Sequence, residues 1–195
     1  MSTKSFAGNE ERPKHSVIFE SGDFEIRKYE AYYVVATDYD EGRGESTGDA
    51  FRRLFGYISG DNKKSEKVEM TAPVTIDKKV SEKIEMTAPV TLTTSSTVKT
   101  MTFMIPSRFY ETAIPEPTNE KVKVVKVESQ LRAVVGFSWI AGDEKKEEKT
   151  GELKAWLNSL EKYEQIGEPI YAGYNSPYTL PWLKTHEMMI EIKEK

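Results

Sequence analysis

The two histidines are the side chains of this 195-residue sequence best suited to proton transfer or metal ligation. His15 lies in a polar N-terminal stretch, and His186 directly precedes Glu187 near the C-terminus. Histidine is a common general base and metal ligand because its imidazole titrates near neutral pH. Neither histidine stands in a Gly-x-Ser-x-Gly, His-Glu-x-x-His or phosphate-loop motif, or at a recognisable catalytic spacing from a carboxylate. The sequence therefore predicts a protein that is not an enzyme.

Cysteine is absent from the chain, which excludes disulfides, thiolate nucleophiles and thiolate metal sites. The seven methionines suit core packing better than metal ligation. Carboxylates are numerous, and geometry rather than spacing decides whether one acts as a general acid. A hydrolase built on a glutamate such as Glu187 therefore stays open as an alternative.

The charge balance argues against nucleic-acid binding and membrane insertion. The net charge is −4 with a pI near 5.5, whereas a duplex binder carries a basic face that neutralises phosphates. No stretch approaches the roughly 18 apolar residues of a membrane span, and residues 1–16 lack the apolar core of a signal peptide. We expect a soluble, cytoplasmic protein with a disordered arm over residues 1–16 and a single domain over residues 17–195.

Two stretches have the periodicity of amphipathic helices, with apolar residues at i, i+3, i+4 and i+7. The first stretch, Gly42–Gly60, offers N-cap residues between Ser46 and Asp49 and a C-cap glycine at its end. The second, Asp143–Gly167, is followed by Pro169. The apolar faces consist of Phe51, Leu54, Phe55 and Ile58 in the first helix, and of Leu153, Trp156, Leu157 and Leu160 in the second.

The other ordered segments are predicted to be strands. Ser16–Asp40 is interpreted as a hairpin with its turn at Glu30-Ala31, and Lys121–Ile140 as a second hairpin around Ser129-Gln130. The order of hairpin, helix and strands thus occurs twice, with a split near Thr118. Two such units favour one antiparallel barrel with a helix packed on each half. Further strands are expected at Thr100–Ile105, Pro169–Tyr174 and His186–Ile192.

A short repeat lies between the two units. Residues 65–76 read SEKVEMTAPVTI and residues 81–92 read SEKIEMTAPVTL. Alternating apolar and charged residues predict a strand in each copy, and the proline of each copy removes one ladder donor, so it belongs at an edge or a strand end. Two copies at this spacing are too few and too short for a solenoid. We interpret the repeat as a local duplication that forms a hairpin or a surface insertion.

Four segments of the chain resemble the SOUL haem-binding protein family. They read FEIRKY at residues 24–29, FRRLFGYISGDN at 51–62, MTAPV at 70–74 and 86–90, and YAGYNSPYTLPWLKTHEMMIEI at 171–192. The resemblance extends from about Phe19 to the C-terminus. It implies an α+β fold, namely a distorted antiparallel β-barrel of two pseudo-symmetric halves that each pack one α-helix. It also implies that a tetrapyrrole binds in an apolar cleft beside the first helix and the loop before the last strand.

Two positions depart from the pattern of the family. Where one family member is thought to use an axial histidine, this chain has Lys28, which is a poor iron ligand while protonated. Where another member has an arginine suited to a haem propionate, this chain has Gly48, so Arg52 or Arg53 would have to replace that contact. The remaining iron-ligand candidate is His186, whose plainer interpretation is a strand-end residue bonded to backbone or to its neighbour.

The candidate binding residues lie on the first helix and on the loop before the last strand. Phe51 and Phe55 are candidates for the cleft wall, although packing in the core would also explain them. The loop is unusually apolar for a segment that normally faces solvent, so it either folds over the barrel end or forms the other wall. The predicted cofactor-binding set is Phe51, Phe55, Arg52, Tyr178, Leu180 and Trp182.

These residues predict a non-enzymatic carrier or buffer that binds haem or a related porphyrin reversibly, mainly through its apolar faces and without a strong axial ligand. Burial of a few hundred Å² at about 25 cal/mol per Å² supplies several kcal/mol before ordering costs, which corresponds to micromolar affinity. The alternatives are a small-molecule or regulatory binding domain that does not use haem, a module whose apolar loop docks a partner protein, and a hydrolase.

Overall fold

The structure is a computed structural model, and it describes residues 11–64, 68, 74–78, 98–111, 113–174 and 179–195. The second MTAPV copy and residues 70–73 of the first lie outside these residues, as does Tyr178. These described residues form one antiparallel sheet with two α-helices, which confirms the predicted α+β fold and distorted barrel. Within the described residues, neither helix is long and apolar enough to cross a membrane.

The two helices begin differently. The first, α1 (Thr47–Ser59), starts with a capping box in which Ser46 and Asp49 each bond the backbone N–H of the other, and it ends at Gly60 with φ +117°. Both signals were visible in the sequence. The second, α2 (Asp143–Ser159), has no side-chain N-cap. It ends at Leu160 in an extended conformation, so the prediction that it continues to Gly167 is wrong. The apolar periodicity that holds the helix on the sheet also stops at Leu160.

The strands follow the order β1-β2-β7-β10-β9-β4-β5-β3-β6, and β8 pairs with β10. Neighbouring strands are antiparallel throughout. The strand bounds are β1 His15–Ser21, β2 Phe24–Tyr29, β3 Tyr32–Asp40, β4 Val74–Lys78, β5 Val98–Met104, β6 Val122–Val127, β7 Gln130–Ser138, β8 Tyr163–Gln165, β9 Ile170–Gly173 and β10 Thr185–Glu194.

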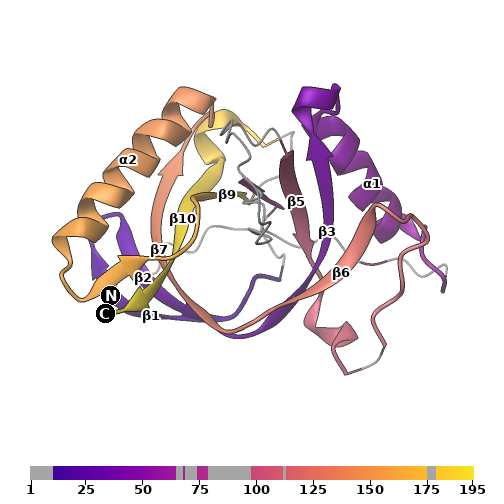
Figure 1. Ribbon diagram of the computed structural model, residues 1–195, viewed down its shortest axis with the longest axis horizontal. Coiled ribbons are helices and arrows are strands. Elements are labelled where there is room, and N and C mark those ends of the chain that lie inside the picture. Colours follow the sequence, from indigo (N-terminus) through magenta and orange to yellow (C-terminus); the bar gives the residue numbers. More distant parts are fainter. Residues whose placement is uncertain (1–10, 65–67, 69–73, 79–97, 112, 175–178) are drawn as a thin grey trace, which may run out of the picture.

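The sheet curls into two halves with a helix on the outside of each (Figure 1). We call β3, β4, β5, β6 and α1 the α1 half, and β1, β2, β7, β8, β9, β10 and α2 the α2 half. Each half has an outer face under its helix and an inner face turned toward the other half. Because side chains alternate along a strand, each strand contributes to both faces. The outer core of the α1 half includes Leu54, Tyr57 and Phe103, and that of the α2 half includes Ile26, Leu153 and Leu157.

Both predicted hairpins are wrong in their pairing. The strands β2 and β3 do not pair with each other; β2 pairs with β1 and β7, and β3 with β5 and β6. The real hairpin is β1–β2, which turns at Gly22 with φ +64°. Tight two-residue hairpins need positive φ in the turn, and neither Glu30-Ala31 nor Ser129-Gln130 has it within the described backbone. At both places the chain instead crosses from one half to the other.

Candidate functional site

Two phenylalanines of α1 form a stacked aromatic pair at the surface of the molecule. Phe51 and Phe55 stack with ring centroids 5.9 Å apart and planes 14° from parallel. Phe51 is half-buried and also meets Phe103 edge-on at 5.4 Å. Phe55 is 48% exposed, so core packing explains the inner ring better than the outer one. The pair therefore presents one anchored ring and one ring open to a ligand.

The arginines beside this pair have different surroundings. Arg52 is exposed, and its guanidinium bonds the Asp49 carboxylate at 2.5 Å. Arg53 is largely buried, where it pairs with Glu45 at 2.9 Å and donates to the Asp38 carbonyl at 3.1 Å. Hydrogen bonds from Arg53 and Lys121 lower the pKa of Glu45 to about 2. Of the two arginines, only Arg52 is placed to meet a bound anion without breaking a buried contact.

The cleft on this side of the molecule has a mixed polar and apolar lining. It has a volume of about 430 Å³ and lies between α1 and residues 117–122. Its lining includes Arg52 and Asp61, together with Thr118 and Asn119, but not Phe51 or Phe55. The predicted residue Arg52 therefore lies between this cleft and the rings of Phe51 and Phe55.

The other predicted wall lies before β10. Leu180 and Trp182 are 50% and 54% exposed, and Trp182 belongs to a short 3₁₀ helix, η3 (Pro181–Leu183), that contacts β7. The neighbouring end of β7 exposes Trp139, whose φ of +80° lies in the left-handed region that is uncommon for a non-glycine residue. These side chains form a second exposed apolar surface. It packs on the α2 half, whereas α1 packs on β3, β5 and β6.

His186 is buried and both of its ring nitrogens are bonded. Nε2 lies 2.7 Å from the Trp139 carbonyl, and Nδ1 lies 2.8 Å from the Tyr171 hydroxyl. A carbonyl only accepts, so Nε2 carries the proton and Nδ1 accepts from the phenol. Burial lowers the pKa of His186 and favours this neutral form. Binding iron through this side chain would require breaking one of the two bonds.

The two positions that depart from the resemblance lie on opposite halves. Lys28 is an exposed residue of β2 and pairs with Leu131 of β7, so it belongs to the half that does not carry α1. Gly48 is exposed in the first turn of α1. A Cβ added there would meet Ser46 Oγ at 3.5 Å and Arg52 Nη1 at 3.8 Å, which are ordinary contacts. A side chain at position 48 is therefore sterically allowed.

The sequence interpretation missed a buried polar network on the inner face of the α2 half. The Arg27 guanidinium pairs with Glu25 at 2.6 Å and with Glu187 at 3.0 Å, and the Tyr174 hydroxyl donates to Glu187. Burial opposes the charge on Arg27, but Glu187 and the other partners hold the pKa of Arg27 above its ordinary value. Burial raises the pKa of Tyr29 to about 12.

The signal for this network was present in the motifs. Arg27 and Tyr29 are alternate residues of FEIRKY, so they share one face of β2. The alternation places the two side chains on one face, but it does not show that this face is buried in the folded protein. Glu187, the sequence candidate for a general acid, is buried and fixed by Arg27 and Tyr174.

Comparison with known proteins gives a family match over nearly the whole chain. The family model described as SOUL heme-binding protein matches residues 10–191. Heme-binding protein 2 of Mus musculus is 29% identical over 170 residues, and its Homo sapiens counterpart is 29% identical over 164 residues. Each alignment covers 82% of this chain and 73% of the relative.

Solved structures share the fold at low sequence identity. The EcmrR C-terminal domain superposes with a TM-score of 0.58 at 9% identity, covering 88% of this chain and 98% of that domain. A protein described as a hydrolase from Listeria innocua gives a TM-score of 0.54 at 10% identity, covering 97% of this chain and 96% of that one. At such identity the likeness shows a common architecture and carries no activity from one protein to another.

Proposed function

Because this chain belongs to the SOUL heme-binding protein family, we propose that it binds haem or another tetrapyrrole reversibly on the exposed apolar surface of α1, and that it does so as a carrier or buffer without catalysing a reaction. The half-exposed ring of Phe55, stacked on the anchored ring of Phe51, carries this proposal. A flat macrocycle covers such a ring pair by offset stacking. Leu180, Trp182 and Tyr178 complete the proposed set; Leu180 and Trp182 are exposed on the α2 half, where they would offer a separate apolar face to a ligand.

The polar contacts that the ligand requires fit the residues beside the ring pair. A porphyrin such as haem has two propionates, and the exposed guanidinium of Arg52 is placed to pair with one of them. This would compete with the bond from Arg52 to Asp49, which is a solvent-exposed surface pair and therefore weak. Iron in a bound haem would add Lewis acidity and redox chemistry, for which the described residues supply neither a free histidine nitrogen at His186 nor a histidine at position 28.

A hemin titration followed at the Soret band tests the proposal. The wild type should show a saturable shift at micromolar hemin, and Phe55→Asp should weaken binding at least tenfold, because it places a carboxylate against the macrocycle. Phe19→Asp is the matched control, since Phe19 is a similarly exposed ring at 44% on β1. It should change the affinity by less than twofold. Equal weakening by both substitutions, or no saturable shift in the wild type, would refute the proposal.

Two further variants sharpen the assignment. His186→Ala should bind hemin like the wild type, because this histidine is not expected to ligate iron. Gly48→Arg should tighten binding about two- to fivefold through a second exposed ion pair with a propionate. Gly48→Gln is its control, because it removes the flexible glycine from the helix without adding charge. A Gly48→Arg variant no tighter than Gly48→Gln would show that the propionates lie elsewhere.

A further inference from the structure

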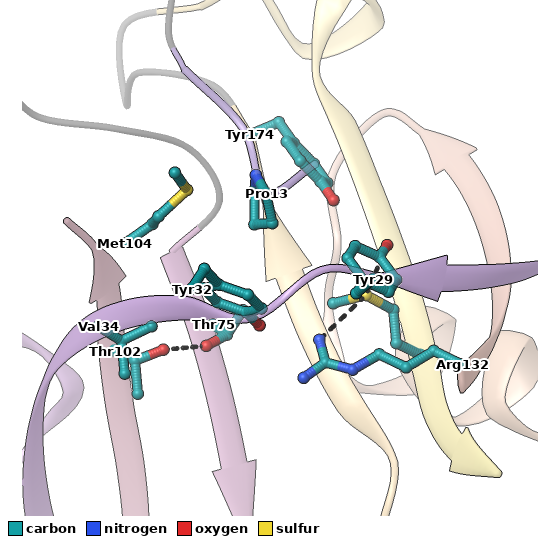
Figure 2. A pocket seen from close by; sticks show the side chains of 10 residues that line it. Pro13, Tyr29, Tyr32, Val34, Thr75, Thr102, Met104, Arg132 and Tyr174 are labelled. Atoms are coloured by element: carbon teal, nitrogen blue, oxygen red, sulfur yellow. Dashed lines mark hydrogen bonds between the residues drawn. The ribbon is translucent and has the colours of Figure 1, made fainter. Parts of the chain in front are cut away.

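Between the two halves lies a small cavity with one charged side chain. Its volume is about 20 Å³, which is room for roughly one water molecule. The α2 half contributes Tyr29, Tyr174, Met189 and Arg132, and the α1 half contributes Tyr32, Val34, Thr75, Thr102 and Met104. Figure 2 shows Arg132 extending from its strand toward the α1 half, below Tyr29.

The charge of Arg132 is buried without a carboxylate beside it. Arg132 is 6% exposed, and no carboxylate oxygen of the described residues lies within the 4.0 Å of an ion pair. Its guanidinium donates to the Met189 sulfur at 3.8 Å and lies 5.2 Å from the centroid of the Tyr29 ring. With the Gln130 amide turned so that its oxygen faces Arg132, that oxygen accepts from Nε at 3.1 Å.

The cross-strand neighbours of Arg132 do not supply a carboxylate that pairs with it directly. Arg132 pairs with Arg27 on one side and with Glu191 on the other. Arg27 already has two carboxylates, and Glu191 reaches Arg132 only through the Gln130 amide, which it bonds at 3.1 and 3.2 Å. An isolated buried charge is costly unless it is paired. The cavity thus offers a guanidinium, aromatic rings and thioethers to a group that brings a negative charge.

Residues 11–14 cover this cavity, and we call them the strap. Pro13 is buried and lies between Tyr174 and the rings of Tyr29 and Tyr32 (Figure 2). The Glu11 carboxylate accepts from the Ser107 N–H at 3.0 Å, which attaches the strap to the α1 half.

On the other side the strap contacts the α2 half. The Arg12 guanidinium lies 4.6 Å from the Tyr174 ring centroid. Beyond the strap is an open groove of about 840 Å³. Pro13, Tyr29 and Tyr174 line both the groove and the cavity, so withdrawal of the strap would join the two. The strap is held by a few contacts, which include the bond between its own exposed Glu11 carboxylate and the Ser107 N–H and the bond from the Glu30 N–H to the Lys14 carbonyl at 3.0 Å.

We propose that the space between the halves is a second binding site, for an apolar carboxylate whose anionic group pairs with Arg132, and that the strap occupies this site until the ligand displaces Pro13. An aromatic or aliphatic monocarboxylate fits because the lining residues supply one cation within an otherwise uncharged surface of rings, thioethers and hydroxyls. This site is separate from the surface of Phe51 and Phe55, and it does not depend on tetrapyrrole binding.

Isothermal titration of the full chain with 1-naphthoate, and with neutral 1-naphthamide as the matched probe, tests this site. The wild type should bind naphthoate saturably and more tightly than the amide. Arg132→Gln should weaken naphthoate binding at least tenfold and change amide binding by less than twofold. Arg43→Gln is the control, because Arg43 is 86% exposed and bonds only at the surface. Naphthoate binding that is no tighter than amide binding, or that survives Arg132→Gln, would overturn the proposal.

The strap gives a test that does not alter the buried cation. Pro13→Gly removes the ring that fills the site, so naphthoate should bind severalfold tighter to this variant than to the wild type. Unchanged or weaker binding would overturn the role of the strap, even if Arg132→Gln failed to fold. Hemin titrations of the same variants should match the wild type, so a failure at this site is distinguishable from a failure at α1.

Discussion

The inner face of the α2 half is charged and hydrogen-bonded, whereas the inner face of the α1 half is apolar with scattered hydroxyls. The first contains Arg27, Arg132 and Glu187, and the second contains Val34 and Met104 with a hydroxyl pair between Thr75 and Thr102. The outer faces are alike, since both pack apolar side chains under a helix. The comparison teaches that the outer faces hold the fold together, whereas the inner faces carry the differences on which the proposed carboxylate site between the halves depends.

Breaking the charge network should have the largest effect. Glu187→Leu leaves the buried Arg27 without one of its two carboxylates and Tyr174 without its acceptor. Loss of one partner of a buried pair costs about 3–5 kcal/mol. Urea unfolding should show a loss in this range, and adding Arg27→Met should recover part of it, because it removes the buried guanidinium that has lost one of its carboxylates and leaves only the more exposed Glu25 carboxylate. A loss below about 1 kcal/mol would show that the network is solvated and not buried.

Matched Leu→Ala substitutions under the two helices test whether the two outer faces contribute equally to the free energy of unfolding. Leu54 of α1 and Leu153 of α2 are both fully buried at 0% exposure. Leu→Ala in a core costs about 3 kcal/mol through lost burial and an unfilled cavity. Each variant should lose a similar amount by urea unfolding. A loss confined to one helix would mean that the other half contributes little to the cooperative core.

Alkaline pH should weaken the α2 half through its buried phenols. The pKa of Tyr29 is raised to about 12, whereas an unfolded tyrosine titrates near 10. Between these values the unfolded state has lost the proton that the folded state keeps, so stability falls as pH rises. Stability should fall less steeply from pH 9.5 to 11 for Tyr29→Phe than for the wild type. Parallel pH profiles would contradict the burial of this hydroxyl.

The hydroxyl pair of the α1 half should matter least. Thr102→Val keeps the shape of the side chain but leaves the half-buried Thr75 hydroxyl without its partner. An unsatisfied hydroxyl of this kind costs about 1 kcal/mol, which is well below the cost at Glu187. If Thr102→Val and Glu187→Leu lowered the free energy of unfolding by the same amount, the proposed contrast between the inner faces would be contradicted.

The sequence predicted the helices and strands from signals in neighbouring residues. Strand pairing and the burial of each sheet face depend on segments that are distant in the sequence, so they were not predicted. The cap residues and spacing of α1 were readable because they depend on neighbours along the chain. The crossings at Glu30-Ala31 and Ser129-Gln130 were not, because a short polar link suits a hairpin or a crossover equally well until the partner strands are known. Strand alternation likewise fixed which residues share a face without showing that the face of Arg27 and Arg132 is covered by the other half.

The candidate site was predictable in part for the same reason. The helix periodicity marked Phe51 and Phe55 but could not say which ring the sheet would cover, and the structure leaves Phe55 half-exposed. The apolar residues before β10 were recognised by composition. Their packing on the α2 half, next to the backbone outlier at Trp139, depends on strand order and was beyond sequence reasoning.

The measurement that most directly tests the division between outer and inner surfaces is a hemin titration of Phe55→Asp beside Arg132→Gln. We predict that Phe55→Asp weakens hemin at least tenfold and that Arg132→Gln changes its affinity by less than twofold. The opposite pattern, with hemin binding lost in Arg132→Gln and kept in Phe55→Asp, would place the tetrapyrrole between the halves and contradict the account.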